Sequence, residues 1–370
     1  MKVLIATPLY PPDIGGPATY SKKIADELPK HGIDVDVLSF GDVRHLPKII
    51  RHVLYFWKVF WRGRTADIIF AQDPVSVGVP AACAAFLLRK PLIIKVVGDY
   101  AWEQGVQRFG IDELLDEFLK TQYGVGVFLL RAAQRFSTKR ARRIIVPSNY
   151  LKSVVVQWGI RPEKIAVMYN DIHVPLLQGS KDDMRKRLGI PQDAFLFFSA
   201  GRLVPWKGFE MLIDVMSNLI ATHPKFLFYI AGDGPQHQYL IGRIYAAGLE
   251  NNISLLGSLS HNALLTYIRS CDIFLFNTGY EGFSHQLLEA FASGTPVITT
   301  TAGGNREIVR DGENTIVAEY NNRTAWESAI QTMIHDSALR VRLSQRAQKD
   351  ANRFLGNHMV EELVKTFKNL

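Results

Sequence analysis

Cysteine is scarce in this sequence, and long apolar runs are missing. Cys83 and Cys271 are its two cysteines. They provide neither a disulfide framework nor a cysteine zinc site, and this scarcity is typical of a reducing compartment. No uncharged apolar run approaches the ~18 residues that a membrane-spanning helix requires. The opening MKVLIATPLYPP has the wrong length and cleavage chemistry for a signal peptide. We therefore expect a cytoplasmic protein.

The net positive charge of the chain comes from its first half. Residues 1–170 carry 24 Lys and Arg against 15 Asp and Glu, whereas the remaining residues carry 19 against 20. This imbalance favours an anionic partner for the first half, and nucleic acid and an anionic membrane surface both qualify. A non-catalytic basic protein that binds one of these surfaces is one hypothesis. Because the chain has no nucleic-acid-binding motif, we expect no nucleic acid partner.

Short apolar runs alternate with longer helical patterns along the chain. Buried parallel strands joined by crossover helices produce such an alternation. The alternation stops at residues 168–183, MYNDIHVPLLQGSKDD, and then restarts. Two successive series predict two doubly wound, Rossmann-like α/β domains. The predicted strands are Val3–Thr7, Val35–Ser39, Asp67–Ala71, Leu92–Val97, Ile144–Pro147, Phe195–Ala200, Phe226–Ala231, Ile253–Leu256, Asp272–Asn277, Pro296–Thr300 and Thr315–Ala318.

Two loops after predicted strands carry residues that suit phosphate. Gly15 and Gly16 precede a helix that starts near Pro17, and the free N–H groups there suit an anion. A plain turn between strand and helix explains these glycines equally well. In SAGRLVPWKG, Arg202 and Lys207 fit a diphosphate. Two solvated cations are the simpler interpretation of that pair, but the carboxyl edge of a strand favours binding.

The stretch EGFSHQLLEA places two carboxylates around a helix start. If the helix begins near Ser284, Glu289 lies off the buried face, one turn after His285, and both point at a shared cleft. Glu281 stands in the loop ahead, where the N–H groups of residues 282–285 are free donors. One acid then suits a pair of sugar hydroxyls and the other a ribose. Spacing alone favours two solvent-facing glutamates, whereas the order of the motifs along the chain favours a site.

The second half of the chain resembles the donor-binding domain of retaining glycosyltransferases of family four, which have the GT-B fold. Their signature is Glu, seven residues, then Glu, and the stretch from Glu281 to Glu289 matches it. GRLVPWKG, AGDGP, GTPVITT and GGNREIV match the family in order and spacing, and VPSNYLKS and the closing helix extend the similarity. The resemblance implies two domains facing a central cleft. Residues 1–170 with helix 350–370 would bind the acceptor, and residues 171–349 the nucleotide-sugar donor.

The resemblance also implies roles for individual residues in a hexosyltransferase. Glu281 would contact the donor sugar as a catalytic residue, and Glu289 would contact the ribose. Arg202 and Lys207 would bind the donor diphosphate, and the glycine pair would close over it from the other domain. The remaining donor-binding candidates are Gly15, Gly16, Gly282, Phe283, Ser284, His285 and, near the nucleobase, Ser258.

The chain departs from the family pattern after the fourth strand. Many members carry a His there, but this chain reads IIKVVGDYAWEQ, with Gly98 at the expected position. Asp99 is a catalytic candidate that would approach a sugar in its place, or else an ordinary turn residue. Ser284 replaces the usual Gly, and its hydroxyl suits a helix cap.

The family's chemistry retains the anomeric configuration and lets the leaving diphosphate take the acceptor proton, so positioning and charge stabilisation carry the catalysis. A metal-dependent transferase would need a D-x-D motif at a strand end, and the match at Asp34–Asp36 lies within a predicted strand. We therefore expect no metal and no cofactor beyond the nucleotide-diphosphate sugar that serves as donor. An alternative function is a nucleotide-sugar epimerase of similar fold, which would act without an acceptor.

Residues 48–64, KIIRHVLYFWKVFWRGR, combine aromatic and basic side chains. In a helix, Trp57 and Trp61 lie on one apolar stripe, and Arg51, Lys58 and Arg62 lie largely on the other side. Such a helix suits an anionic membrane surface. A crossover helix with a solvated basic edge is the alternative. Together with the charge of the first half, the pattern favours a peripheral protein on the inner face of the cell membrane. Its acceptor would be a lipid-linked or polysaccharide-precursor glycan.

Overall fold

The computed structural model describes residues 1–13, 15–175 and 179–370, which form two compact units. Unit 1 comprises Met1–Tyr169 and Asn357–Leu370, and unit 2 comprises Asn170–Gly356. The expected division after residue 349 falls inside helix α14 (Ser337–Ala351), which packs on helix α12 (His285–Ala292) of unit 2. The chain therefore returns to unit 1 only after Gly356. Residues 176–178 of the expected linker lie outside the described residues.

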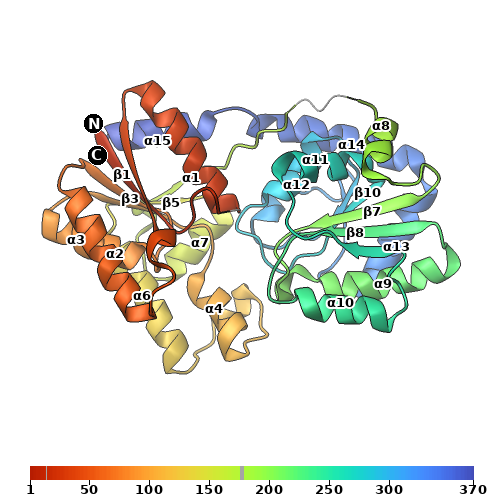
Figure 1. Cartoon of the computed structure of the whole chain (residues 1–370), viewed down its shortest axis with the longest axis horizontal. Helices are drawn as coiled ribbons and strands as arrows, with labels where there is room; N and C mark the ends of the chain where they lie inside the picture. Colours follow the sequence, from red (N-terminus) through yellow and green to blue (C-terminus); the bar gives the residue numbers. More distant parts are fainter. Residues whose placement is uncertain (14, 176–178) are drawn as a thin grey trace. The chain divides into compact units, whose positions relative to one another are not determined.

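Unit 1 contains one parallel six-stranded sheet within the described residues, in the order β2-β1-β3-β4-β5-β6 (Figure 1). The order reverses between β1 and β3, so the carboxyl ends of these strands flank a topological switch point. Five strands were predicted to within two residues. The three-residue strand β6 was not, because it is too short to produce a pattern. The strands are β1 (Lys2–Thr7), β2 (Asp34–Ser39), β3 (Ile68–Ala71), β4 (Leu92–Lys95), β5 (Arg143–Val146) and β6 (Ile165–Val167).

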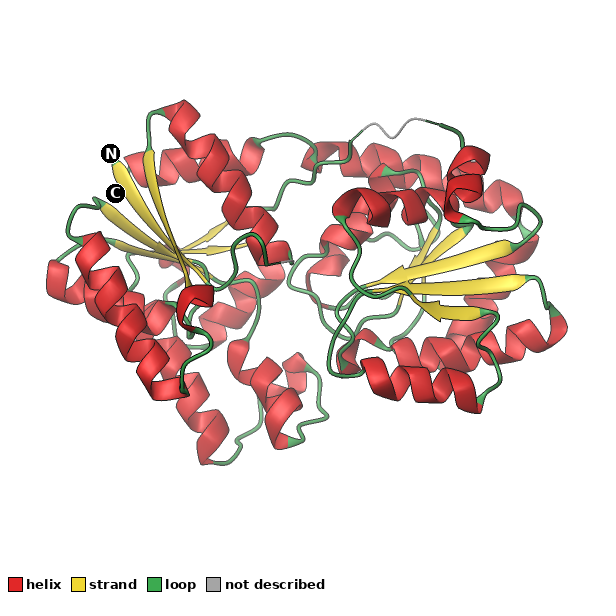
Figure 2. Cartoon of the chain, viewed as in Figure 1, coloured by secondary structure: helices red, strands yellow, loops and turns green. Residues whose placement is uncertain are grey.

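Helices cover both faces of this sheet (Figure 2). Helices α1 and α15 pack on Val3, Ile5 and Phe70 in one core, and Phe367 of α15 meets Phe70 edge to face at 5.6 Å. Helix α2 approaches the opposite face, because Gly63 lies against Ile69. The helices are α1 (Gly16–Glu27), α2 (Lys48–Gly63), α3 (Gly78–Leu88), α4 (Tyr100–Phe109), α5 (Leu115–Phe118), α6 (Val125–Arg140), α7 (Asn149–Gln157) and α15 (His358–Lys368), with 3-10 turns η1 (Leu28–His31), η2 (Phe40–Val43) and η3 (Pro162–Lys164).

Unit 2 repeats this architecture with the strand order β12-β11-β10-β7-β8-β9 (Figure 2). Its switch point lies between β7 and β10, and all six of its predicted strands are present. The strands are β7 (Phe195–Ala200), β8 (Phe226–Ala231), β9 (Ile253–Leu255), β10 (Ile273–Phe276), β11 (Val297–Thr299) and β12 (Ile316–Val317). The other elements are α8 (Lys181–Leu188), α9 (Phe209–Thr222), α10 (His237–Ala246), α11 (His261–Ser270), α13 (Arg323–His335), η4 (Pro205–Lys207), η5 (Gly303–Glu307) and η6 (Asn352–Phe354).

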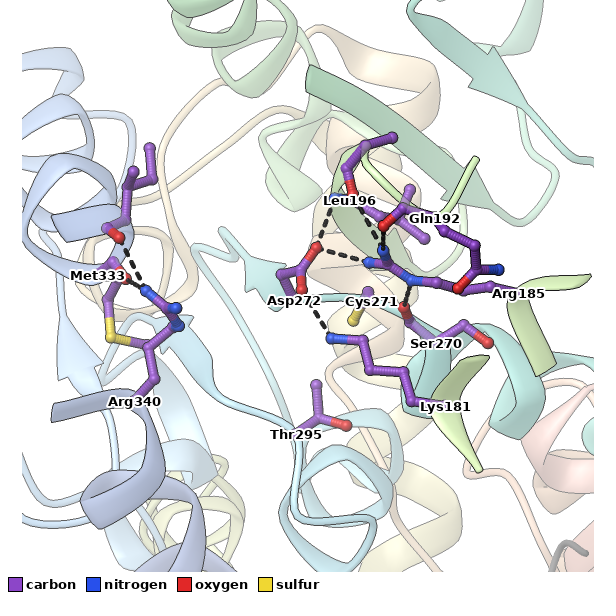
Figure 3. A network of polar contacts seen from close by, with 12 residues as sticks. Lys181, Arg185, Gln192, Leu196, Ser270, Cys271, Asp272, Thr295, Met333 and Arg340 are labelled. Atoms are coloured by element: carbon purple, nitrogen blue, oxygen red, sulfur yellow. Dashed lines mark hydrogen bonds and ion pairs between the residues drawn. The ribbon is translucent and has the colours of Figure 1, made fainter. Parts of the chain in front are cut away.

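A buried arginine fastens α8 to the amino edge of the unit 2 sheet (Figure 3). The guanidinium of Arg185 donates to the carbonyls of Ser270 at 2.9 Å and Ala194 at 3.0 Å, and it pairs with Asp272 at 2.6 Å. The second oxygen of Asp272 pairs with Lys181 at 2.7 Å. Because every strong donor of Arg185 has a partner, the buried charge is compensated. This network lies at the edge opposite the carboxyl ends of the strands.

Candidate functional site

The loops after β7 and β10 flank the switch point of unit 2, where open α/β sheets bind their ligands. Arg202 lies exposed in the first loop, and its guanidinium has no hydrogen bond or ion pair with the described residues. Lys207 ends the same loop and forms an ion pair with Glu281 of the second loop. The two side chains are 11% and 12% exposed. The structure therefore pairs two of the predicted residues, and the third, Arg202, stands on the same loop without a partner among the described residues.

Main-chain and amide hydrogen bonds fix the two loops to each other. The side-chain nitrogen of Asn277, directly after β10, donates to the Gly208 carbonyl at 3.1 Å and to the side-chain oxygen of Asn321 at 2.8 Å. The amide of Gly279 donates to the Trp206 carbonyl at 2.8 Å. These hydrogen bonds therefore hold in place the two loops that carry the ion pair. Sequence reasoning missed Asn277. Its position could have indicated a role in the site, because an amide side chain at the carboxyl end of a buried strand is well placed to bind a neighbouring loop.

The AGDGP turn after β8 packs closely against the backbone of the loop that carries Arg202. A Cβ on Gly232 would lie 1.8 Å from the Gly201 carbonyl oxygen, and the Leu203 amide donates to the Asp233 carbonyl at 3.0 Å. Gly303 plays the same part for the other loop, because a Cβ there would lie 2.1 Å from the Glu281 carbonyl oxygen. These glycines are required by close backbone approach.

Ser284 begins α12 as predicted. Its hydroxyl accepts a hydrogen bond from the Leu287 amide at 3.2 Å, which confirms the expected cap. Phe283 is buried, and its ring packs 5.4 Å from that of Phe354. Its side chain is thus a packing residue, so the expected contact with a donor is left to its main chain. Gly282 is also buried, and His285 is half-buried on the first turn.

Glu289 is buried, which corrects the solvent-facing alternative. Its side chain is 9% exposed, and its Oε1 lies 2.9 Å from the Nε2 of His261. This hydrogen bond and the charge of Glu289 raise the pKa of His261 above its usual value, against the opposing effect of burial. His261 is the first residue of α11, and Ser260 caps that helix. Sequence reasoning did not select His261.

The remaining donor-binding candidates belong to other segments of the chain. Ser258 is exposed in the loop between β9 and α11. Gly15 and Gly16 belong to unit 1, where Gly15 caps α1 with a φ of 147° and Gly16 has open space around its Cβ position. Positive φ and open space are the features that a glycine pair near a ligand needs. Ile14 beside them lies outside the described residues.

Asp99 is a structural residue, which corrects its assignment as catalytic. It is fully buried, and it caps α4 by accepting a hydrogen bond from the Trp102 amide at 3.0 Å. Its other oxygen accepts from the indole of Trp158 at 2.9 Å, and Gln134 donates to both oxygens. Burial raises its pKa. A carboxylate with these partners ties α4 and α6 to the residue that follows α7, and it has no oxygen left for a sugar.

The acids of the D-x-D motif lie on β2, as expected. Asp34 is exposed, and Asp36 pairs with Arg62 at 3.1 Å. Over residues 1–13, 15–175 and 179–370, no group of three or more His, Cys, Asp or Glu side chains is arranged to hold a metal ion.

Helix α2 is both a packed crossover helix and an exposed apolar surface. Tyr55 and Val59 are fully buried inside unit 1, whereas Trp57 and Trp61 are 48% and 59% exposed. The expected basic side is more engaged than predicted: Lys58 pairs with Asp42 at 3.4 Å, Arg62 pairs with Asp36, and the Arg51 guanidinium lies 5.6 Å from the Phe40 ring. In the part of the chain that the structure describes, no helix is long and apolar enough to cross a membrane.

Comparison with known proteins agrees with the site. The family model for "Glycosyl transferases group 1" matches residues 180–350, and that for "Glycosyltransferase Family 4" matches residues 14–174. An uncharacterised glycosyltransferase of Methanocaldococcus jannaschii is 26% identical over 100% of this chain and 98% of its own length. A D-inositol 3-phosphate glycosyltransferase of Acidothermus cellulolyticus is 25% identical over 96% of this chain and 86% of its own length.

A solved structure shows the same fold. The crystal structure of Anabaena HepE in complex with UDP and glucose superposes with a TM-score of 0.80 at 22% identity, and the match covers 100% of both chains. The predicted family, fold and enzyme class are thus confirmed. The chain belongs to glycosyltransferase family 4, has the GT-B fold and is a glycosyltransferase.

Proposed function

We propose that this enzyme transfers a sugar from a nucleoside-diphosphate donor, with retention of configuration and without a metal. The observation that carries the proposal is the ion pair of Lys207 and Glu281 at the unit 2 switch point. The same loop carries Arg202, whose guanidinium has no partner among the described residues. Two cations on one loop suit the two phosphates of a donor. Glu281 and Glu289 supply acceptors for sugar and ribose hydroxyls.

Donor binding would exchange the partners of the ion pair. In this structure Glu281 neutralises Lys207. A diphosphate carries more charge than one carboxylate, so it replaces Glu281 as the partner of Lys207. The Glu281 carboxylate is then released toward the hydroxyls of the donor sugar. The pair therefore keeps both groups in place before the donor arrives, which lowers the cost of organising the site.

The transfer itself breaks the bond between the anomeric carbon and the diphosphate oxygen. The acceptor oxygen forms its bond to that carbon on the same face, and its proton passes to the departing diphosphate oxygen. No enzyme base is needed for this step. Arg202 and Lys207 stabilise the negative charge that develops on the leaving group, which is the part that a metal ion plays in other transferases.

The acceptor is proposed to be a lipid-linked or polysaccharide-precursor glycan, reached from an anionic membrane surface. Of the seventeen exposed large hydrophobic residues that the structure describes, twelve lie on α2, α3, α4 and α6 of unit 1. Helix α2 packs on α3, and α3 and α4 pack on α6, so these side chains belong to adjoining helices. A hollow of about 660 Å³ between the ends of α3 and α6 is lined by Arg89, Lys90 and Arg140. Exposed tryptophans beside cations suit anionic lipid headgroups.

Donor binding is tested with a panel of nucleotide sugars and the purified enzyme. UDP-glucose is the first probe, because HepE binds UDP-glucose in its crystal structure. A donor at 100 times its dissociation constant raises the free energy of unfolding by about 2.7 kcal/mol. Lys207→Met should abolish this stabilisation. Lys225→Met, which removes a largely exposed pair with Asp193 in the same unit, should preserve it. If no nucleotide sugar stabilises the wild-type enzyme, the proposal is wrong.

Product analysis separates a transferase from the epimerase alternative. An epimerase converts the sugar nucleotide when no acceptor is present, whereas a transferase leaves its configuration unchanged. Retention is read from the anomeric coupling of the glycoside product by NMR. Turnover should persist in EDTA. A β-linked product from an α-linked donor, or loss of turnover in EDTA, would refute the corresponding part of the proposal.

Membrane contact is tested by flotation with vesicles that contain anionic phospholipid. We expect the wild-type enzyme to float at low salt and less so at high salt. Trp57→Ser with Trp61→Ser should reduce flotation. The control is Tyr245→Ser, because Tyr245 is a 63% exposed aromatic residue of unit 2. Absence of wild-type binding at low salt would remove the membrane from the proposal.

A further inference from the structure

His261 links two parts of unit 2 that are distant in the sequence. It follows the loop that leaves β9 and begins α11, and it reaches Glu289 on α12 at 2.9 Å. Its side chain is 43% exposed, whereas that of Glu289 is 9% exposed. The contact is therefore a solvent-accessible imidazole that holds a nearly buried carboxylate. Neither the family signature nor the spacing of the acids points to this histidine.

The carboxylate of Glu289 is only half engaged. Oε1 receives the hydrogen bond from His261, and Oε2 has no hydrogen-bond partner among the described residues. The hydrogen bond at Oε1 fixes the orientation of the carboxylate and leaves Oε2 available as an acceptor. A carboxylate oxygen is a strong hydrogen-bond acceptor, so this second oxygen is suited to a hydroxyl that a ligand brings.

The charges around His261 identify Glu289 as its electrostatic partner. Helix α12 carries two titratable side chains, His285 and Glu289, and β7 carries none. Helix α8 packs on α11 at its far end, where Arg185 donates to the Ser270 carbonyl and pairs, like Lys181, with Asp272. The other charged side chains of α8 are exposed, namely Asp182, Asp183, Lys186 and Arg187, and Arg269 lies on the last turn of α11 itself.

We propose that His261 is a positioning residue for the nucleoside of the donor. Its imidazole fixes the Glu289 carboxylate so that Oε2 accepts a ribose hydroxyl, and its imidazolium form offsets the charge of Glu289 when the anionic donor binds. The inference rests on the proposed function, because it needs a donor that carries a ribose and a diphosphate.

The sign of the pH dependence follows from the contact. Glu289 raises the pKa of His261, so the imidazolium form is favoured below that raised pKa and is lost as the pH rises through it. Above it, the uncompensated carboxylate repels a doubly negative donor. The dissociation constant of the donor should therefore increase with pH across this range. The turnover number should change little, because His261 acts on the nucleoside and not on the reacting carbon.

The experiment measures binding of UDP-glucose and 2′-deoxy-UDP-glucose by calorimetry. If another nucleotide sugar of the panel binds more tightly, that donor and its 2′-deoxy form are used. Neither probe has a phosphate that titrates near neutral pH. We expect His261→Ala to weaken binding of the ribose form by about tenfold, the size of one hydrogen bond to a charged group. Binding of the 2′-deoxy form should be weak already, and it should lose only the smaller, electrostatic part of the effect.

Two further variants complete the design. His261→Asn keeps an N–H donor, so it should recover part of the affinity but show no rise of the dissociation constant between pH 6 and 8.5. His335→Ala removes an exposed histidine of α13 and should match the wild type. Equal losses for the ribose and 2′-deoxy forms, or an unchanged pH profile in His261→Asn, overturn the inference and leave the proposed function intact. A wild-type enzyme that binds no nucleotide sugar overturns both.

Discussion

Gly232 is the position where a single methyl group should disable the site without touching a ligand. A Cβ there would lie 1.8 Å from the Gly201 carbonyl oxygen, whereas real Cβ contacts stay above 3.0 Å, so the loop must move by about 1.2 Å. The φ of 137° adds backbone strain of about 1–3 kcal/mol for a residue with a side chain. We expect Gly232→Ala to reduce the free energy of unfolding by about 2–4 kcal/mol in total.

The same displacement moves Arg202 and Lys207, which follow Gly201 in the loop. A misplacement of about 1 Å reduces kcat/KM by about 10²-fold. Thermal unfolding and steady-state kinetics of the purified variant measure the two effects. Gly242→Ala is the matched control, because Gly242 lies inside α10 with nothing within 4 Å of its Cβ position. It should be neutral or stabilising by up to about 1 kcal/mol. A Gly232→Ala enzyme with wild-type stability and kinetics would refute the close approach of the two loops.

Three more predictions concern charge and burial. Lys207→Met and Glu281→Gln should each lower kcat/KM by about 10²–10³-fold. In the double variant, their effects on the free energy of unfolding should be non-additive by about 1–2 kcal/mol; additive effects would contradict the ion pair. Arg185→Met should destabilise unit 2 by about 3–5 kcal/mol, because it leaves buried carbonyls without donors, whereas Lys181→Met should cost at most about 1 kcal/mol in the same melts. Burial raises the pKa of the Cys271 thiol, so a thiol reagent should modify it only after unfolding, as a time course with and without denaturant would show; rapid labelling of native Cys271 would contradict its burial.

The sequence predicted most of the fold because buried parallel strands leave an unmistakable pattern. Eleven short apolar runs became eleven strands, and their restart after residue 190 indicated a second sheet. The strand Ile165–Val167 was missed because three residues carry too little periodicity. The end of unit 2 was misplaced because α14 continues to Ala351, and helical spacing alone does not tell which sheet a helix covers.

The site was predictable where chemistry is local and not where it depends on tertiary contacts. The Arg202 and Lys207 loop and the two acids follow from motifs along the chain. Asp99 follows the end of a strand, as a site residue would, so its position suggested a role in the site. Trp158 and Gln134, which donate hydrogen bonds to its oxygens, lie far away in the sequence. His261 was overlooked, whereas Asp99 was wrongly selected. His261 stands at the start of a helix whose sequence does not suggest a site, and only folding brings it to Glu289.

The central claim is that the loops after β7 and β10 of unit 2 bind a nucleotide sugar together. Hydrogen exchange of backbone amides, with and without a saturating nucleotide sugar, tests it most directly. The account predicts slowed exchange in residues 201–208 and 278–285, and weaker slowing near the start of α11. Protection confined to other segments, with these loops exchanging at the same rate in both samples, would contradict it.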